Sequence, residues 1–168
     1  YAGDYDIVII KLSGAGAYLW HNFYGSSISD YAYSIVLDAA GNTYMVGYSY
    51  ATWNGPGNTA PVYPFTGIDD IIVLKLSSAG AYLWHAFYGS ATNDQGMGIA
   101  MDASGNVYVS GTSMATWNGP GAAAPLNPYT GNGDIFVVKM SGAPPSITSF
   151  TPSCGDSRTV VTITGKNF

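Results

Sequence analysis

Residues 70–90 read Asp70-Ile-Ile-Val-Leu-Lys-Leu-Ser-Ser-Ala-Gly-Ala-Tyr-Leu-Trp-His-Ala-Phe-Tyr-Gly-Ser90, and they repeat, almost letter for letter, a stretch that begins 64 residues earlier at Asp6. Aligned without a gap, residues 6–57 and 70–121 are identical at 32 of 52 positions, and the opening run returns a third time at residues 134–141. Self-similarity at a period of this size is typical of solenoids, propellers and other repeat arrays. The repeat therefore decides the architecture before any single residue is interpreted.

Composition favours a folded chain that is rich in strands. The 168 residues are 47% hydrophobic and 14% aromatic, which excludes simple disorder, and every acidic residue is Asp. β-branched and aromatic residues suit pleated sheets, whereas Gly, Asn, Asp and Pro suit turns. We therefore predict an all-β protein.

Charge and cysteine usage exclude several classes of partner. The net charge is −5, with only five Lys and Arg residues, so a nucleic-acid partner is not expected. No run approaches the ~20 apolar residues of a membrane helix, so membrane insertion is not expected either. The single Cys154 allows no internal disulfide. Because the chain opens inside a repeat, we interpret it as a piece of a longer polypeptide.

One period of the repeat contains four predicted strands joined by short antiparallel connections. A turn at residues 38–42 carries a Gly-Asn pair, which tolerates the positive φ that tight hairpin loops need. A loop rich in Pro and Gly closes the period before the cycle restarts at Asp70. The predicted strands are residues 6–12, 17–24, 33–38 and 43–50, and the loop is residues 51–68.

Four strands per period, without the long loop, give a unit near the ~40–50 residues of a propeller blade. The runs at residues 7–10, 71–74 and 135–138 are apolar at consecutive positions, so both faces of these strands should be covered. Stacking of blade on blade provides this cover. A β-helix is the alternative, but its parallel coils would not need a hairpin turn at a fixed place in each period.

These motifs resemble a known family. Residues 4–141 carry Asp-Ile-hydrophobic-Lys-Leu-Ser, then Tyr-Gly-Ser, then Asp-Ala-x-Gly-Asn-x-Tyr in a fixed order, which resembles the SBBP-type β-propeller repeat of bacterial proteins. The Trp-Asn-Gly-Pro-Gly loop departs from that pattern. Residues 145–168 resemble the opening of an immunoglobulin-like IPT/TIG domain. The resemblance implies a large secreted or surface-attached protein with a role in adhesion or scaffolding.

The expected organisation is a partial β-propeller of 64-residue repeats over residues 1–143, followed over residues 144–168 by the initial strands of an immunoglobulin-like sandwich. The propeller part would comprise half a blade, one full blade and a three-stranded blade. Open strand edges readily template pairing, so we expect other copies, or the remainder of a longer chain, to pair with them. The predicted edges lie near residues 6–24, 135–139 and 159–164.

Seven of the ten Asp residues recur in register, at 6/70/134, 30/94 and 38/102. One interpretation makes Asp30 and Asp94 weak candidates for Ca²⁺ ligands, since Ca²⁺ takes carboxylate and carbonyl oxygens. The other, which we favour, is that these Asp residues cap turns, with no cofactor. His21 and His85 are copies in different repeats rather than a convergent metal pair. No catalytic group is expected.

The repeated Ala-Thr-Trp-Asn-Gly-Pro-Gly loop contains the most distinctive candidates for ligand binding: Trp53, Asn54, Trp117 and Asn118. An exposed Trp beside an Asn suits stacking on a sugar while bonding its hydroxyls. In the alternative interpretation each Trp folds back to anchor its own loop. We therefore carry two functional hypotheses: a non-enzymatic extracellular scaffold or adhesion module that assembles into a fibre or surface layer, and a carbohydrate-binding or carbohydrate-active propeller.

Overall fold

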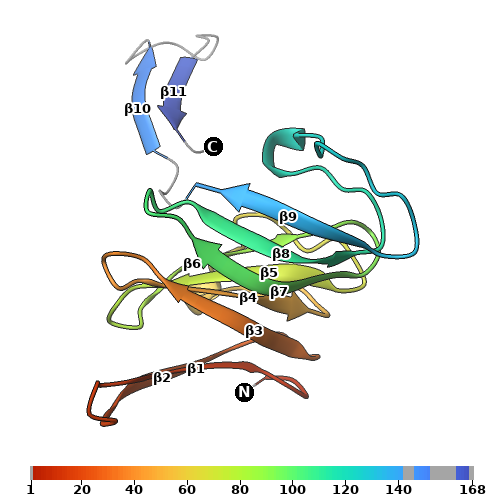
Figure 1. Ribbon diagram of the computed structural model, residues 1–168. Helices are drawn as coiled ribbons and strands as arrows, with labels where there is room; N and C mark the ends of the chain where they lie inside the picture. Colours follow the sequence, from red (N-terminus) through yellow and green to blue (C-terminus); the bar gives the residue numbers. More distant parts are fainter. Residues whose placement is uncertain (1, 142–145, 152–161, 167–168) are drawn as a thin grey trace.

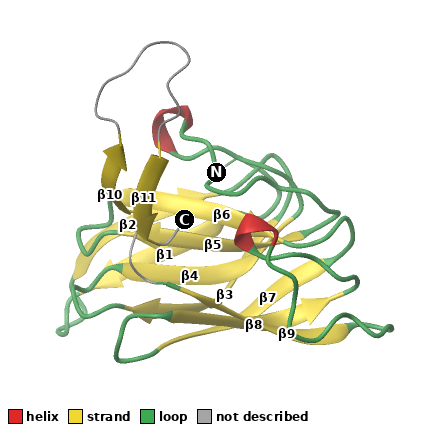
Figure 2. Ribbon diagram, turned by 90° about the horizontal axis from the view of Figure 1, so that it is seen from above, coloured by secondary structure: helices red, strands yellow, loops and turns green. Residues whose placement is uncertain are grey.

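The computed structural model describes residues 2–141, 146–151 and 162–166. These residues form eleven strands, paired antiparallel, and no α-helix; the only helical segments among them are two single 3-10 turns, η1 (Pro56–Asn58) and η2 (Pro120–Ala122). In Figure 2 both turns lie in the loops outside the strands. Within the same residues, no helix is long and apolar enough to cross a membrane. The all-β prediction is confirmed.

Nine strands divide into three sheets, which follow one another along the chain and lie one above the other in Figure 1. Neighbouring strands within a sheet follow in chain order, so each sheet is a simple meander. Sheet I contains β1 (Ile7–Leu12) and β2 (Tyr18–Tyr24); sheet II contains β3 (Asp30–Leu37), β4 (Thr43–Ser49), β5 (Asp70–Leu76) and β6 (Tyr82–Tyr88); sheet III contains β7 (Asp94–Met101), β8 (Val107–Ser113) and β9 (Asp134–Met140).

The predicted sequence of two, four and three strands is therefore confirmed at the level of antiparallel sheets. The clearest boundary error is in β3, which begins at Asp30 rather than Tyr33, because Asp30 pairs with Ser49 across the ladder before the apolar pattern starts. The predicted tight turn is also present. Gly41 lies there at φ 77°, the left-handed region that glycine adopts most cheaply.

Each sheet has two faces, which we name after β5 and its equivalents β1 and β9, which lie 64 residues before and after it. Face A carries the residues equivalent to Ile72, Leu74 and Leu76, and face B carries those equivalent to Ile71 and Val73. Two apolar cores join the sheets: face B of sheet I packs on face A of sheet II, and face B of sheet II packs on face A of sheet III. In both contacts, therefore, face B of one sheet packs on face A of the next sheet along the chain.

Coverage of the apolar runs differs from the prediction. Every residue of β5 is buried because a sheet covers each side of it. In β9 the burial alternates, because face B of sheet III has no covering sheet among the described residues, and Ile135 and Val137 are 82% and 70% exposed. In β1 the opposite face is open, and Val8 and Ile10 are exposed. Identical apolar runs thus have one covered face or two, according to their place in the stack.

After sheet III, β10 (Ser146–Thr151) pairs antiparallel with β11 (Thr162–Lys166). This pair falls within the segment predicted to open an immunoglobulin-like domain. Cys154 and the predicted edge at residues 159–161 lie outside the described residues. The immunoglobulin-like assignment stays a prediction.

Candidate functional site

The Asp residues that recur in register organise turns, either at or next to the first residue of a strand or, for Asp38 and Asp102, in the hairpin turn that follows one. Asp30 and Asp94, the two Ca²⁺ candidates, are buried. In each, Oδ2 accepts the backbone N–H of a Ser four residues earlier at 2.6 Å, and Oδ1 accepts the hydroxyl of a Ser at the end of the neighbouring strand. Burial raises the pKa of Asp30 above its ordinary value. Serine donors thus satisfy both oxygens, as the turn-capping interpretation requires.

Asp70 differs from this pattern. Its Oδ2 accepts the backbone N–H of Thr66 at 2.6 Å and the Thr66 hydroxyl at 3.1 Å, but its buried Oδ1 has no hydrogen-bond partner. Burial, reinforced by the nearby Asp94 carboxylate, raises the pKa of Asp70 to about 6. A buried carboxylate with an unsatisfied oxygen is a costly group at neutral pH.

Trp53 is the first of the predicted binding residues, and it is buried. Its indole stacks on the imidazole of His85, with ring centroids 3.9 Å apart and planes 7° from parallel. Tyr24 of sheet I covers the indole from a centroid distance of 6.1 Å. Trp53 therefore anchors its loop between sheets I and II, and its indole is not available at the surface.

Trp117 occupies the equivalent position one period later, with different surroundings. It is only partly buried, and its ring contact is with Phe136 of β9, at a centroid distance of 5.8 Å. Asn118 beside it is exposed. Asn54 in the first loop is exposed too and donates through its side-chain amide to Asn58 at 2.7 Å. The glycan-binding interpretation stays a prediction, now concentrated on Trp117 and Asn118.

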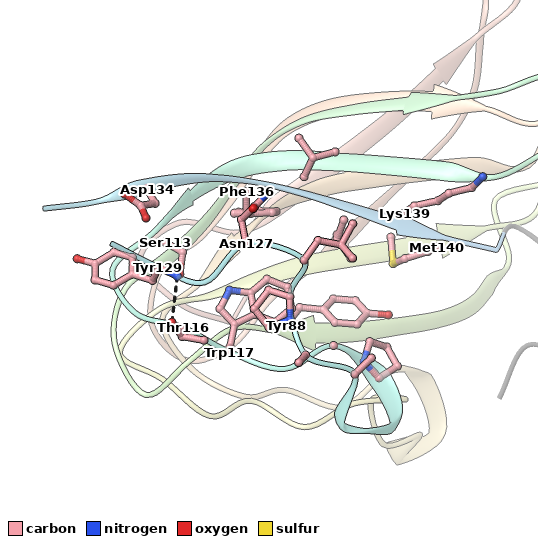
Figure 3. A pocket seen from close by; sticks show the side chains of 18 of the residues that line it. Tyr88, Ser113, Thr116, Trp117, Asn127, Tyr129, Asp134, Phe136, Lys139 and Met140 are labelled. Carbon is pink, nitrogen blue, oxygen red and sulfur yellow. Dashed lines mark hydrogen bonds between the residues drawn. The ribbon is translucent and has the colours of Figure 1, made fainter. Parts of the chain in front are cut away.

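A groove of about 1030 Å³ lies between β9, the loop that carries Trp117, and β6 of sheet II. Figure 3 shows Trp117, Tyr129, Phe136 and Met140 around it, and Tyr88 from sheet II on its wall. The Tyr129 backbone N–H donates to the Thr116 hydroxyl at 3.1 Å and so holds the two ends of the loop together. The lining is mainly apolar and aromatic, which suits a hydrophobic occupant.

Analysis of the sequence predicted the free edge at residues 135–139 but missed the groove beside it. The signal was present in the repeat itself: the third period stops matching after residue 141, so the strand that should follow β9 is replaced by an unrelated segment. A Trp loop without its covering strand leaves an apolar gap.

The described residues contain no group of three or more His, Cys or Asp side chains that could hold a metal ion. His21 and His85 lie on β2 and β6, each bonded through Nδ1 to a Tyr hydroxyl of its own strand at 2.8 Å. The structure therefore does not bring them together. Sequence reasoning did not foresee the structural role of His85.

The fold and this groove define the chain as a stack of repeated antiparallel sheets with an incomplete last sheet. A comparison with protein-family models finds no match, and none of the curated proteins matches the sequence.

Proposed function

We propose that the chain is a non-enzymatic scaffold module of propeller-type blades that assembles head to tail with further copies of the same repeat. One observation supports this most directly. The two end faces of the stack are one face A and one face B, and a pair of such faces already forms each contact between neighbouring sheets. Face A of sheet I is open, and so is face B of sheet III, while every internal contact pairs face B with face A.

The residues at the two ends are apolar, as this contact requires. On face A, Val8, Ile10 and Leu12 are between 45% and 59% exposed, and on face B Ile135 and Val137 are more exposed still. Contiguous exposed apolar side chains of this kind mark interaction surfaces. Such a contact between unlike faces is heterologous, so repetition gives either a closed ring or an open filament.

The bridges between successive repeats support the same geometry. Parallel backbone bridges join Tyr5 to Ser29 and, 64 residues later, Asp69 to Asn93. Both successive sheets are therefore placed by the same local connection. A regular step from sheet to sheet is what a propeller or a stacked array needs. The resemblance described above favours the propeller and an extracellular or cell-surface location, which remain part of the proposal.

The strength of the contact can be bounded. Full burial of a Val, Leu or Ile side chain contributes about 1.5–3 kcal/mol, so five partly exposed ones would contribute about 4–8 kcal/mol together. Association costs about 4 kcal/mol or more in lost freedom. The end faces alone should therefore bind weakly, with a net gain of at most about 4 kcal/mol, and assembly should appear only at protein concentrations that approach roughly 1 mM or when copies are tethered.

Sedimentation velocity across this range tests the proposal with two blocked variants. Val8→Lys/Ile10→Lys blocks face A, and Ile135→Lys/Val137→Lys blocks face B. Neither variant alone should stack, but an equimolar mixture should form more 1:1 dimer than either variant alone, because each variant keeps the face that the other has lost. Ile68→Lys, an exposed residue on neither face, is the control and should assemble like the unaltered chain. A mixture that assembles no more than either blocked variant alone, or no assembly by the unaltered chain at 1 mM, would refute head-to-tail stacking.

Glycan binding is the second candidate function. The observation that favours it is the groove, where the partly exposed Trp117 lies with Tyr129 and Asn127. Aromatic faces beside amide groups suit sugar recognition. The test is given with the predictions below.

A further inference from the structure

In the repeat that contains β5, strand β6 occupies the position that is equivalent to the groove beside β9. There, β6 lies between two neighbours: it pairs with β5 along one edge, and its other edge bonds to the Trp53 loop. The Val62 N–H donates to the His85 carbonyl at 2.8 Å, and the Phe87 N–H donates to the Tyr63 carbonyl at 3.0 Å. The strand position is therefore hydrogen-bonded from both sides.

The last repeat has both of these walls but no strand between them. β9 pairs only with β8 among the described strands, so the edge that corresponds to the β5–β6 ladder is free. On the far side, the loop residues equivalent to Val62 and Tyr63 are Leu126 and Asn127, which line the groove, and Leu126 is fully exposed. An apolar side chain so exposed beside a free strand edge indicates a missing neighbour.

Gly55 and Gly119 show the same difference at one matched position. In the filled repeat a Cβ on Gly55 would lie 2.5 Å from the ring of Tyr82 in β6, so the loop approaches the strand as closely as glycine allows. In the open repeat the nearest atom to a Cβ on Gly119 is the Ala123 carbonyl oxygen of the same loop, at 3.7 Å. The loop thus leaves space for a strand that the described residues do not supply there.

A strand with the matching sequence and an uncovered face is present at the other end of the molecule. β2 reads Tyr18-Leu-Trp-His-Asn-Phe-Tyr24 and differs from β6 at one of seven positions. The His and Phe that β6 buries against the Trp53 loop are exposed in β2, as His21 and Phe23. The Tyr18 hydroxyl already bonds His21 Nδ1 at 2.8 Å, as Tyr82 bonds His85. The imidazole of His21 is therefore bonded through Nδ1 as in β6, but His21 is exposed, whereas the Nε2 of His85 bonds the Trp53 carbonyl.

We propose that the groove beside β9 accepts strand β2 of a second copy of this chain. The inference extends the assembly proposed above by a second contact, and it has its own test. β2 would leave β1, pair with β9 as β6 pairs with β5, and stack His21 on Trp117. A two-stranded sheet is marginally stable, and exchange of an identical element between copies is a low-cost route to assembly. The exchanged strand gains a second hydrogen-bonded neighbour, because the groove bonds both of its edges.

A labelled peptide with the sequence of residues 17–25, carrying two added lysines at each end for solubility, serves as the probe. Fluorescence anisotropy with the full chain should show saturable binding with a Kd of roughly 100 µM or tighter. The peptide variant His21→Ala/Phe23→Ala and the chain variant Trp117→Ala should each weaken binding at least tenfold. A scrambled peptide of the same composition should not bind. Absence of saturable binding, or binding that is insensitive to both substitutions, would overturn the proposal.

Hydrogen exchange gives a second readout that does not depend on a variant. Binding should slow exchange of the β9 amides that face the free edge, within residues 135–140, and binding that leaves them unprotected would refute strand pairing. The Val8→Lys/Ile10→Lys variant separates this proposal from stacking, since both side chains lie on face A of sheet I, on β1, and neither lines the groove. It should bind the peptide while failing to stack. Stacking that persists in this variant would refute the face contact, whereas loss of peptide binding would refute the assignment of the groove, so the two proposals fail by different results.

Discussion

The Trp53 indole lies flat on the His85 imidazole at a centroid distance of 3.9 Å, and the same imidazole, through Nε2, bonds the backbone carbonyl of Trp53 at 3.0 Å. Because a carbonyl can only accept, Nε2 carries the proton and Nδ1 accepts from the Tyr82 hydroxyl at 2.8 Å. One side chain of β6 thus fixes both the ring and the backbone of the Trp53 loop. Its equivalent in β2, His21, is exposed.

His85 and His21 occupy the same position in successive repeats, so they give a matched test of burial. His85→Ala should lower the free energy of unfolding by about 2–4 kcal/mol, because it removes a buried ring and leaves the Trp53 carbonyl and the Tyr82 hydroxyl without their partner. His21→Ala, on an exposed strand, should change it by no more than about 0.5 kcal/mol. Urea denaturation followed by Trp fluorescence measures both. Equal losses would show that the two positions are structurally alike, contrary to the structure.

The two Trp loops predict a second contrast, between stability and ligand binding. Trp53→Ala should cost about 3–5 kcal/mol, since it empties a buried site between two sheets. Trp117→Ala should cost much less, because that indole is only partly buried. If Trp117 and Asn118 are a sugar platform, Trp117→Ala should also abolish signals on a glycan array, while Asn54→Ala, at the exposed position of the covered loop, leaves them intact. An array without signals for the unaltered chain would reject the carbohydrate hypothesis.

The order of strands could be predicted from the sequence because turn chemistry and apolar runs recur in phase. The turn at residues 38–42, for example, has its Gly at the required positive φ. The faces could not be predicted in the same way. Residues 7–10, 71–74 and 135–138 are almost equally apolar, and only their place in the stack decides whether one face or both are covered.

The candidate site was predictable only in part, for a related physical reason. Trp53 and Trp117 occupy identical heptapeptides, so local sequence gives them the same role. Their difference comes from β6, which pairs with β5 but has no counterpart paired with β9 among the described residues. Likewise His85 carries no local signal, because its function depends on a loop packed over it from the preceding period. Contacts of this range are visible only in three dimensions.

Removal of metal should leave the fold unchanged. Both oxygens of Asp30 and of Asp94 already accept hydrogen bonds from serine residues, so neither carboxylate depends on a cation. A ligand present at 100 times its Kd would stabilise the chain by about 2.7 kcal/mol, a shift of several degrees in Tm. Thermal melts with EDTA, and again after addition of excess Ca²⁺, should coincide. A fall in Tm on chelation that Ca²⁺ reverses would restore the calcium interpretation.

Asp70 and His85 should give the protein opposing pH dependences. Burial, opposed by the bond to the Trp53 carbonyl, lowers the pKa of His85 to about 4 from an ordinary value of 6.5, so the unfolded chain binds the proton more readily and stability falls as pH drops from about 6.5 to 4. Asp70 has the opposite sign. Its pKa of about 6 lies above the ordinary 3.8, so its contribution is most favourable below about pH 4 and is lost as pH rises to 6.

Asp70→Asn separates the two effects, and it should leave stability at pH 7 unchanged or raise it by up to about 3 kcal/mol. The buried Oδ1 and the carbonyl oxygens of Ser90 and Thr92 surround one point, since all three atoms lie between 2.5 and 2.7 Å from the position that a Cβ on Gly67 would take. An amide can donate to such carbonyls, whereas a carboxylate cannot. In this variant stability should fall more steeply from pH 6.5 to 4 than in the unaltered chain, because the opposing contribution of Asp70 is gone. Asp94→Asn, whose carboxylate is fully bonded, is the control and should cost about 1–3 kcal/mol. Urea denaturation at pH 4, 5, 6 and 7 measures all three proteins, and a loss at pH 7 from Asp70→Asn as large as that from Asp94→Asn would show that the charged form of Asp70 is stabilised after all.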